Sequence, residues 1–202
     1  MKKIPVVIVA MTSILGAGSV VAAEQTLAER AIHVCNACHG EGGVSTSAIY
    51  PKLAGQPALY TQEQLKKFRD QGRSDSSPQG YMWGISSLLD DPTIAAIAEY
   101  YAEQKVVPGK AGSPKLMEEG RQIFEKGIPA KAIPACTQCH GQNGEGASVF
   151  PRIASQHAAY LVRQLNEFNT KLRPHGTVMK DKVVKKMSAG EMKAVAAYLQ
   201  AK

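Results

Sequence analysis

The sequence predicts an all-α protein in which two tandem copies of one small helical domain follow an N-terminal export signal. Three observations lead to this prediction. No stretch of the chain has the alternating apolar pattern of a convincing β-strand. Apolar residues recur instead at loosely helical spacing. Finally, the pattern of residues 27–104 returns in residues 116–202, which indicates a duplicated domain.

The duplication is visible in short matched segments. Residues 50–54 (YPKLA) match residues 150–154 (FPRIA) at an offset of 100, and residues 96–100 (AIAEY) match residues 194–198 (AVAAY) at an offset of 98. Further pairs keep the first offset: Gln56 and Gln156, Tyr60 and Tyr160, Leu65 and Leu165, Phe68 and Phe168. The change of offset marks insertions in loops.

Each half predicts the same three helices. We expect them at about 27–36, 57–70 and 92–104 in the first half, and at about 116–126, 157–170 and 189–201 in the second. A loop rich in Gly, Ser and Pro precedes the last helix of each half. In the first half, Asp91 is the expected N-cap of that helix and Pro92 its first residue.

A segment rich in Pro and Gly, residues 105–114, has the composition of a linker. We therefore expect an N-terminal domain at 24–106, a linker at 107–115 and a C-terminal domain at 116–202. A hydrophobic core alone is marginal for a domain of this size, and natural proteins often add a covalent or cofactor staple.

The first 23 residues read as a secretory signal peptide. Met1-Lys2-Lys3 is charged, residues 4–15 are apolar, and small residues end at Ala23. The apolar run is short for a bilayer crossing, which needs about 20 residues. We expect cleavage near Ala23 and export to the periplasm, with an uncleaved anchor as the alternative.

Both pairs of cysteines are spaced for covalent haem attachment. Cys35 and Cys38 are followed at once by His39, and Cys136 and Cys139 by His140. The Cys-x-x-Cys-His pattern places two thiols to form thioethers with the vinyl groups of one porphyrin, and the histidine beneath the iron. A disulfide, zinc or redox-motif reading of a single pair loses force when the motif occurs twice inside a repeat. The sequence therefore predicts two covalently bound haem c groups.

The second ligand of each iron is expected from the region before the last helix. Met82 is the one methionine there in the first half. In the second half Met179 is our choice, because Met187 and Met192 align with the core positions Leu89 and Ile94. The spacing leaves Met187 open as an alternative, and also ligation by His175. A thioether ligand raises the haem potential.

Two further residues are expected to support the haem histidines. Pro51 and Pro151 follow them in the matched segments, and their carbonyls are placed to accept a hydrogen bond from each imidazole. Such a bond orients a metal-bound histidine. Tyr50 and Phe150, which precede these prolines, are expected to wall the haem.

These motifs, with the PKLAGQ and PRIASQ segments and the final AVAAYL helix, resemble the diheme cytochrome c4 family over essentially the whole chain after the signal. The resemblance implies two class I cytochrome c domains related by a pseudo-twofold axis, with His and Met ligands at both irons. It also implies an electron carrier of a respiratory chain, commonly feeding a terminal oxidase, and not an enzyme.

Rival functions use the same haem chemistry. A diheme enzyme such as a peroxidase needs an open sixth position at one iron, which two methionine ligands argue against. A cytochrome subunit of a dehydrogenase complex, with a flavin or quinone partner, differs from a free carrier only in its partner. The sequence leaves peripheral association with a membrane open.

Charge divides the chain unevenly. Residues 24–107 carry 7 basic and 10 acidic side chains, a net of −3, whereas residues 108–202 carry 15 and 7, a net of +8. Such asymmetry orients docking between redox proteins. Our hypothesis is that Lys180, Lys182, Lys185 and Lys186 meet an acidic partner, with a solvated helix face as the alternative interpretation. Nucleic acid is excluded as a partner, because no basic stripe is interleaved with aromatic residues and the chain carries an export signal.

Overall fold

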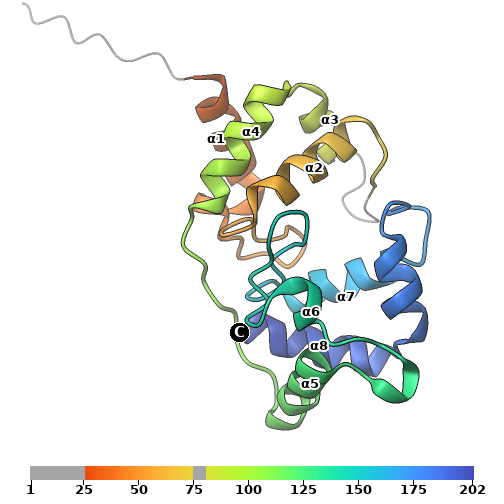
Figure 1. Cartoon of the computed structure of the whole chain (residues 1–202). Coiled ribbons are helices and arrows are strands. Elements are labelled where there is room, and N and C mark those ends of the chain that lie inside the picture. The colour runs from red at the N-terminus through yellow and green to blue at the C-terminus, as the bar shows by residue number, and fades with distance from the viewer. Residues whose placement is uncertain (1–25, 75–80) are drawn as a thin grey trace, which may run out of the picture.

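The computed structural model describes residues 26–74 and 81–202 and consists of helices joined by loops. Figure 1 shows two bodies, one above the other, with the segment between α4 and α5 running down one side. Within the described residues there is no β-strand, only two isolated β-bridges. The predicted all-α class is confirmed. The expected signal peptide lies outside the described residues.

The first body contains α1 (Leu27–His39), η1 (Glu41–Gly43), α2 (Ala58–Arg69), α3 (Tyr81–Ser87) and α4 (Asp91–Ala102). Helix α1 begins with a capping box, in which the Thr26 hydroxyl accepts from the Glu29 amide and the Glu29 carboxylate accepts from the Thr26 amide. It continues through the whole Cys motif, further than the expected 27–36, and ends at His39.

The second body contains α5 (Pro114–Lys126), η2 (Pro129–Lys131), α6 (Thr137–His140), α7 (Ala158–Glu167), the π-helical turn η3 (Met179–Val183), η4 (Val184–Lys186) and α8 (Ala189–Ala201). Here the Cys motif is separated from the first helix. Helix α5 ends at Lys126. Its C-cap is Gly127, whose φ is +69° and whose added Cβ would lie 2.2 Å from the Ile133 carbonyl oxygen. The loop that follows lengthens the entry to Cys136.

Several helix ends differ from the sequence expectation. The N-cap of α4 is Asp90, whose carboxylate accepts from the Thr93 amide, so Asp91 is already helical. Helix α5 starts at Pro114, inside the expected linker, because the Ser113 hydroxyl accepts from the Leu116 amide and caps it there. Helix α3 lies in a region that we expected to be a loop.

Each body has its own apolar core. Side chains of α2 and α4 with Leu89 form the first, and side chains of α5 and α8 form the second: Leu65, Leu89, Ile94, Ile97 and Tyr101; Ile123, Phe124, Ala194, Val195 and Leu199. Helices α5 and α8 cross closely at Gly120, where an added Cβ would lie 2.1 Å from the Ala194 carbonyl oxygen. Only glycine allows this approach.

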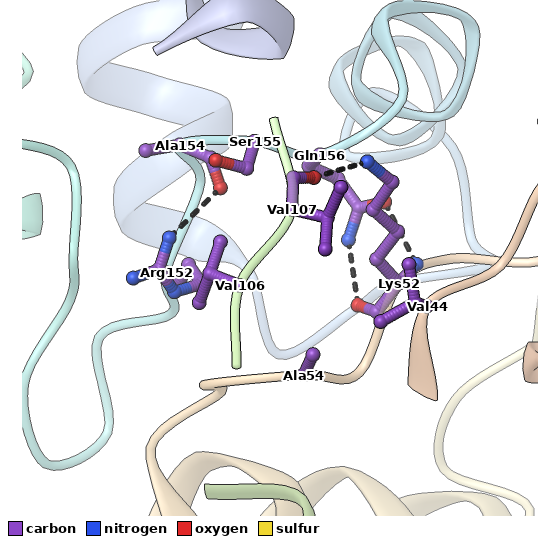
Figure 2. Close-up of a pocket in the computed structure, with 9 residues that line it drawn as sticks. All are labelled: Val44, Lys52, Ala54, Val106, Val107, Arg152, Ala154, Ser155 and Gln156. Carbon is purple, nitrogen blue, oxygen red and sulfur yellow. Dashed lines mark hydrogen bonds between the residues drawn. The ribbon is translucent and has the colours of Figure 1, made fainter. Parts of the chain in front are cut away.

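Reciprocal hydrogen bonds join the two bodies. The Gln156 side chain accepts from the Lys52 amide and donates to the Lys52 carbonyl, both at 2.9 Å. The Gln56 side chain accepts from the Arg152 amide at 2.7 Å and donates to the Arg152 carbonyl at 3.2 Å. Figure 2 shows Lys52 and Gln156 facing each other across this contact. Matched residues exchange matched bonds, as a pseudo-twofold axis requires.

Candidate haem sites

The two histidines of the Cys motifs are buried and held in the same way. His39 Nδ1 lies 2.8 Å from the Pro51 carbonyl oxygen, and His140 Nδ1 lies 2.9 Å from that of Pro151. Both imidazoles are less than a tenth exposed. The predicted prolyl bonds are therefore confirmed, and they leave Nε2 of each ring as the atom for a metal.

Burial also sets the protonation of these rings. It lowers the pKa of His39 and of His140, while the hydrogen bond to each prolyl carbonyl acts in the opposite direction. Both rings are thus held neutral, which is the form that binds a metal.

None of the four cysteines takes part in a disulfide, and they come in matched pairs. Cys35 and Cys136 are half-buried, whereas Cys38 and Cys139 are exposed. Burial raises the pKa of Cys35, and it raises the pKa of Cys136 to about 11. The pairs stay separate from each other, one in each body, as attachment of one porphyrin per body requires.

Apolar side chains beside the motifs fit a flat apolar ligand. Ile49 and Val149, at matched positions, are about half exposed. The Tyr50 ring meets the His39 ring edge-on at 6.2 Å between centroids, and Phe150 meets His140 in the same way at 6.5 Å. Cysteines outside any disulfide, neutral imidazoles and these side chains together fit a covalently bound haem in each body.

The candidate distal methionines are placed differently in the two bodies. Met82 lies in α3 and packs against the first core. Met179 opens the π-helical turn η3 and is half-buried. Met187 packs against the second core and Met192 is buried in it, in keeping with their alignment to Leu89 and Ile94.

Sequence reasoning missed several polar residues that connect the bodies. His157 is half-buried, and its Nε2 lies 3.0 Å from the Ser45 carbonyl oxygen of the other body. Arg73 is 5% exposed and donates to Gln164 across the interface. The matched pairs Gln56 and Gln156 were the one signal that the sequence offered for this contact.

Two haem motifs on two matched helical bodies define a tandem c-type cytochrome. Family models agree: the model described as cytochrome c matches residues 117–201, and the model described as cytochrome c oxidase, cbb3-type, subunit III matches residues 22–100. The chain belongs to the cytochrome c4 family, as the relatives below show. It is a diheme electron carrier with two covalently bound haem c groups.

Relatives match over most of the chain. It is 40% identical to cytochrome c-552 of Acidithiobacillus ferridurans, over 82% of this chain and 72% of that one. It is 36% identical to cytochrome c4 of Pseudomonas aeruginosa, over 83% of each. The solved cytochrome c4 of Acidithiobacillus ferrooxidans superposes with a TM-score of 0.76 and 38% identity, covering 83% of this chain and 98% of that one.

A relative that matches less of the chain is named for a different role. The thiosulfate dehydrogenase electron acceptor of Thiomonas intermedia is 36% identical over 43% of this chain and 40% of its own.

Within residues 26–74 and 81–202, no helix is both long and apolar enough to cross a membrane.

Proposed function

We propose that the chain carries single electrons in the periplasm between partners of a respiratory chain, towards a terminal oxidase, with both irons ligated by histidine and methionine. We propose the domain limits expected above, after cleavage of residues 1–23, except that the C-terminal domain begins with α5 at Pro114. The haems supply the reversible one-electron chemistry. The chain's own residues hold them, exclude water and present them to partners.

The duplicated proximal geometry carries this proposal. Each imidazole is buried, neutral and fixed by a prolyl carbonyl beside a pair of thiols. A rigid ligand that does not change its protonation suits fast electron transfer. A candidate methionine for each iron, Met82 and Met179, argues against an open sixth position, so we propose a carrier and not an enzyme.

We assign Met82 and Met179 as the distal ligands. Met82 packs against the core that also contacts Cys35, on the same haem motif as His39. Met179 begins a π-helical turn, a feature that is frequent at functional sites. Met187 is committed to packing against the second core.

A redox-titrated optical spectrum of the mature protein tests this ligation. Two haems with His and Met ligands predict two one-electron steps and the weak near-infrared sulfur-to-iron band in the oxidised form. Both irons should resist cyanide when oxidised and carbon monoxide when reduced. Rapid binding of either ligand at one iron would instead indicate an open position and an enzyme.

The C-terminal domain offers the docking face for an acidic partner. Lys182, Lys185 and Lys186 are exposed on the segment that also carries Met179, and Asp181 is the single acidic residue in residues 179–187. It pairs with Lys185 at 2.6 Å. Residues 81–91 of the N-terminal domain contain no basic side chain. The two ends therefore suit partners of different charge.

Charge reversal tests the docking face. Replacing Lys180, Lys182, Lys185 and Lys186 with Glu should slow electron transfer to an acidic partner and flatten its ionic-strength dependence. The matched control makes the same change in charge on four exposed lysines away from this segment: Lys105, Lys110, Lys115 and Lys126. Equal rates for the two variants would refute the face.

A second candidate function is that of a cytochrome subunit that accepts electrons from a dehydrogenase. The partial similarity to a thiosulfate dehydrogenase electron acceptor supports it. Purification of the native protein from soluble extract and from membranes separates the two: a stoichiometric dehydrogenase companion supports the subunit, and its absence from both fractions supports the carrier. The same fractionation tests peripheral association with the membrane.

A further inference from the structure

Trp83 directly follows Met82 in α3, and it is the single tryptophan of the chain. Its indole Nε1 donates a hydrogen bond of 2.6 Å to the backbone carbonyl of Arg73. The bond is half-buried. Because α3 is one short helix of 7 residues, a restraint on Trp83 also restrains its neighbour Met82.

The peptide group that accepts this bond is held from the other domain as well. The amide of Ser74 belongs to the same peptide group as the carbonyl of Arg73, and it donates to the carbonyl of Leu172 at 2.8 Å. Hydrogen bonds in such a chain polarise and strengthen one another. One peptide group therefore joins α3 of the N-terminal domain to a loop of the C-terminal domain.

The side chain of Arg73 anchors that peptide group in the interface. Its guanidinium lies over the Phe68 ring at 4.5 Å and donates to Gln64 at 2.8 Å. Across the interface it donates to Gln164 at 3.0 Å and to the Tyr160 hydroxyl at 3.2 Å. Only 5% of the residue is exposed, and these contacts help to hold Arg73 in the interface.

The C-terminal domain repeats the anchor but not the connection to a methionine. Arg173, the counterpart of Arg73, donates to the same two glutamines, at 2.7 Å and 3.3 Å. Met82 and Met179 are 97 positions apart, and at that offset Lys180 takes the place of Trp83. A lysine has no ring N–H that could make the bond.

We propose that Trp83 is a positioning residue that couples Met82 to the domain interface, so that the first iron responds to the state of the interface and the second does not. This inference rests on the ligation proposed above. Loss of the indole bond frees α3 and weakens the hold of the Met82 sulfur on its iron. Loss of contacts across the interface weakens the hold of the same sulfur, because it displaces the Arg73–Ser74 peptide group that accepts the indole bond.

Replacement of one atom tests the coupling in the full-length holoprotein. Because the chain has one tryptophan, biosynthetic incorporation of 3-benzothienylalanine puts sulfur in place of the indole N–H at this site alone. Incorporation of 5-fluorotryptophan keeps the N–H and is the matched control. Trp83→Phe is the genetic version of the same change.

The account predicts a change at one haem only. The midpoint potential of that haem should fall, and carbon monoxide should displace its methionine about threefold to tenfold faster, as loss of one hydrogen bond implies. The methyl resonance of Met82 in the reduced protein, assigned by its loss in Met82→Ala, should shift. The Met179 resonance and the fluorotryptophan control should stay unchanged.

A double-mutant cycle tests the connection to the interface. Arg173→Gln removes the bonds that Arg173 donates to both glutamines. With Trp83 present it should shift the Met82 resonance, and with Trp83→Phe it should shift it much less. Equal shifts in both backgrounds would overturn the coupling.

Two failures are distinguishable. No sulfur-to-iron band in the unaltered protein would refute the methionine ligation, and the coupling with it. If the band is normal, and neither the Met82 resonance nor the midpoint potentials change when the indole N–H is lost, the coupling alone is refuted.

Discussion

The two domains hold their proximal histidines alike and surround their candidate distal methionines differently. His39 and His140 meet prolyl carbonyls at distances that differ by 0.1 Å (2.8 Å and 2.9 Å). On the distal side, the first domain has a short α-helix tied to the interface, whereas the second has a π-helical turn with four lysines nearby. The two domains therefore share their proximal geometry and differ on the candidate distal side.

The entry to each haem motif differs as well. Helix α1 runs through its motif without a break, whereas α5 ends at Lys126 and α6 supplies only the last turn. The inserted loop is held down by Lys131, which donates to both carboxylate oxygens of Glu191 at 2.8 Å. The second domain therefore replaces helix continuity with an ion pair.

The largest expected effect comes from the methionines. Met82→Ala and Met179→Ala should each lower one midpoint potential, abolish about half of the sulfur-to-iron band and open one iron to carbon monoxide. Met187→Ala should instead cost about 2–5 kcal/mol of stability, as removal of a core side chain does, with both bands kept. Loss of the second band in Met187→Ala, and not in Met179→Ala, would exchange their roles.

An intermediate effect is expected at the domain interface. Gln56→Ala leaves the Arg152 amide and carbonyl without their partner, and Gln156→Ala does the same to Lys52. Each should lower the free energy of unfolding by about 1–3 kcal/mol in denaturant titrations. Gln142, which is exposed in a loop, is the control, and Gln142→Ala should stay within about 0.5 kcal/mol of the unaltered protein.

Gln156→Ala should be the more damaging of the two interface variants, because Gln156 also accepts from the His157 amide at 3.0 Å. Values for both variants as small as that of Gln142→Ala would mean that the reciprocal bonds contribute nothing to the joining of the domains.

The smallest expected effect is the pH dependence of the inserted loop. The hydrogen bond from Lys131 lowers the pKa of Glu191, with help from the Ser188 amide. A lowered pKa stabilises the fold above the ordinary glutamate value of about 4.3, and the gain is lost as the pH falls through the lowered value. Lys131→Ala should therefore reduce the free energy of unfolding that the second domain loses on acidification, by about 0.2–1 kcal/mol in total.

Lys115 provides the control for that titration. It pairs with Glu119 at 4.0 Å and its side chain is 88% exposed, so Lys115→Ala should leave the acid limb of the stability curve unchanged. A Lys131→Ala curve that coincides with that of Lys115→Ala would contradict the role of the ion pair.

The sequence was informative wherever chemistry demands a fixed spacing. The Cys-x-x-Cys-His motifs and the prolines beyond them predicted the proximal geometry, because covalent attachment ties those residues to one another. Helix α8 begins and ends where expected, since Ser188 and Glu191 form a capping box that can be read directly. The start of α4 was one residue off because Asp90 and Asp91 are both good caps.

The distal side and the interface could not be derived in the same way. Helix α3 is short and contains Gly84 and two serines, so its local sequence favours a loop, and packing against α2 decides otherwise. The local sequence around Arg73 indicates a surface arginine. Its burial depends on Gln164 and Tyr160 of the other domain, which accept its hydrogen bonds. Contacts between domains depend on tertiary partners that no local pattern contains.

Mass spectrometry of the mature polypeptide, purified after export, tests the central claim most directly. The account predicts a mass equal to residues 24–202 plus two haem increments, with one increment lost in Cys35→Ser/Cys38→Ser and one in Cys136→Ser/Cys139→Ser. A polypeptide with one increment or none would contradict it.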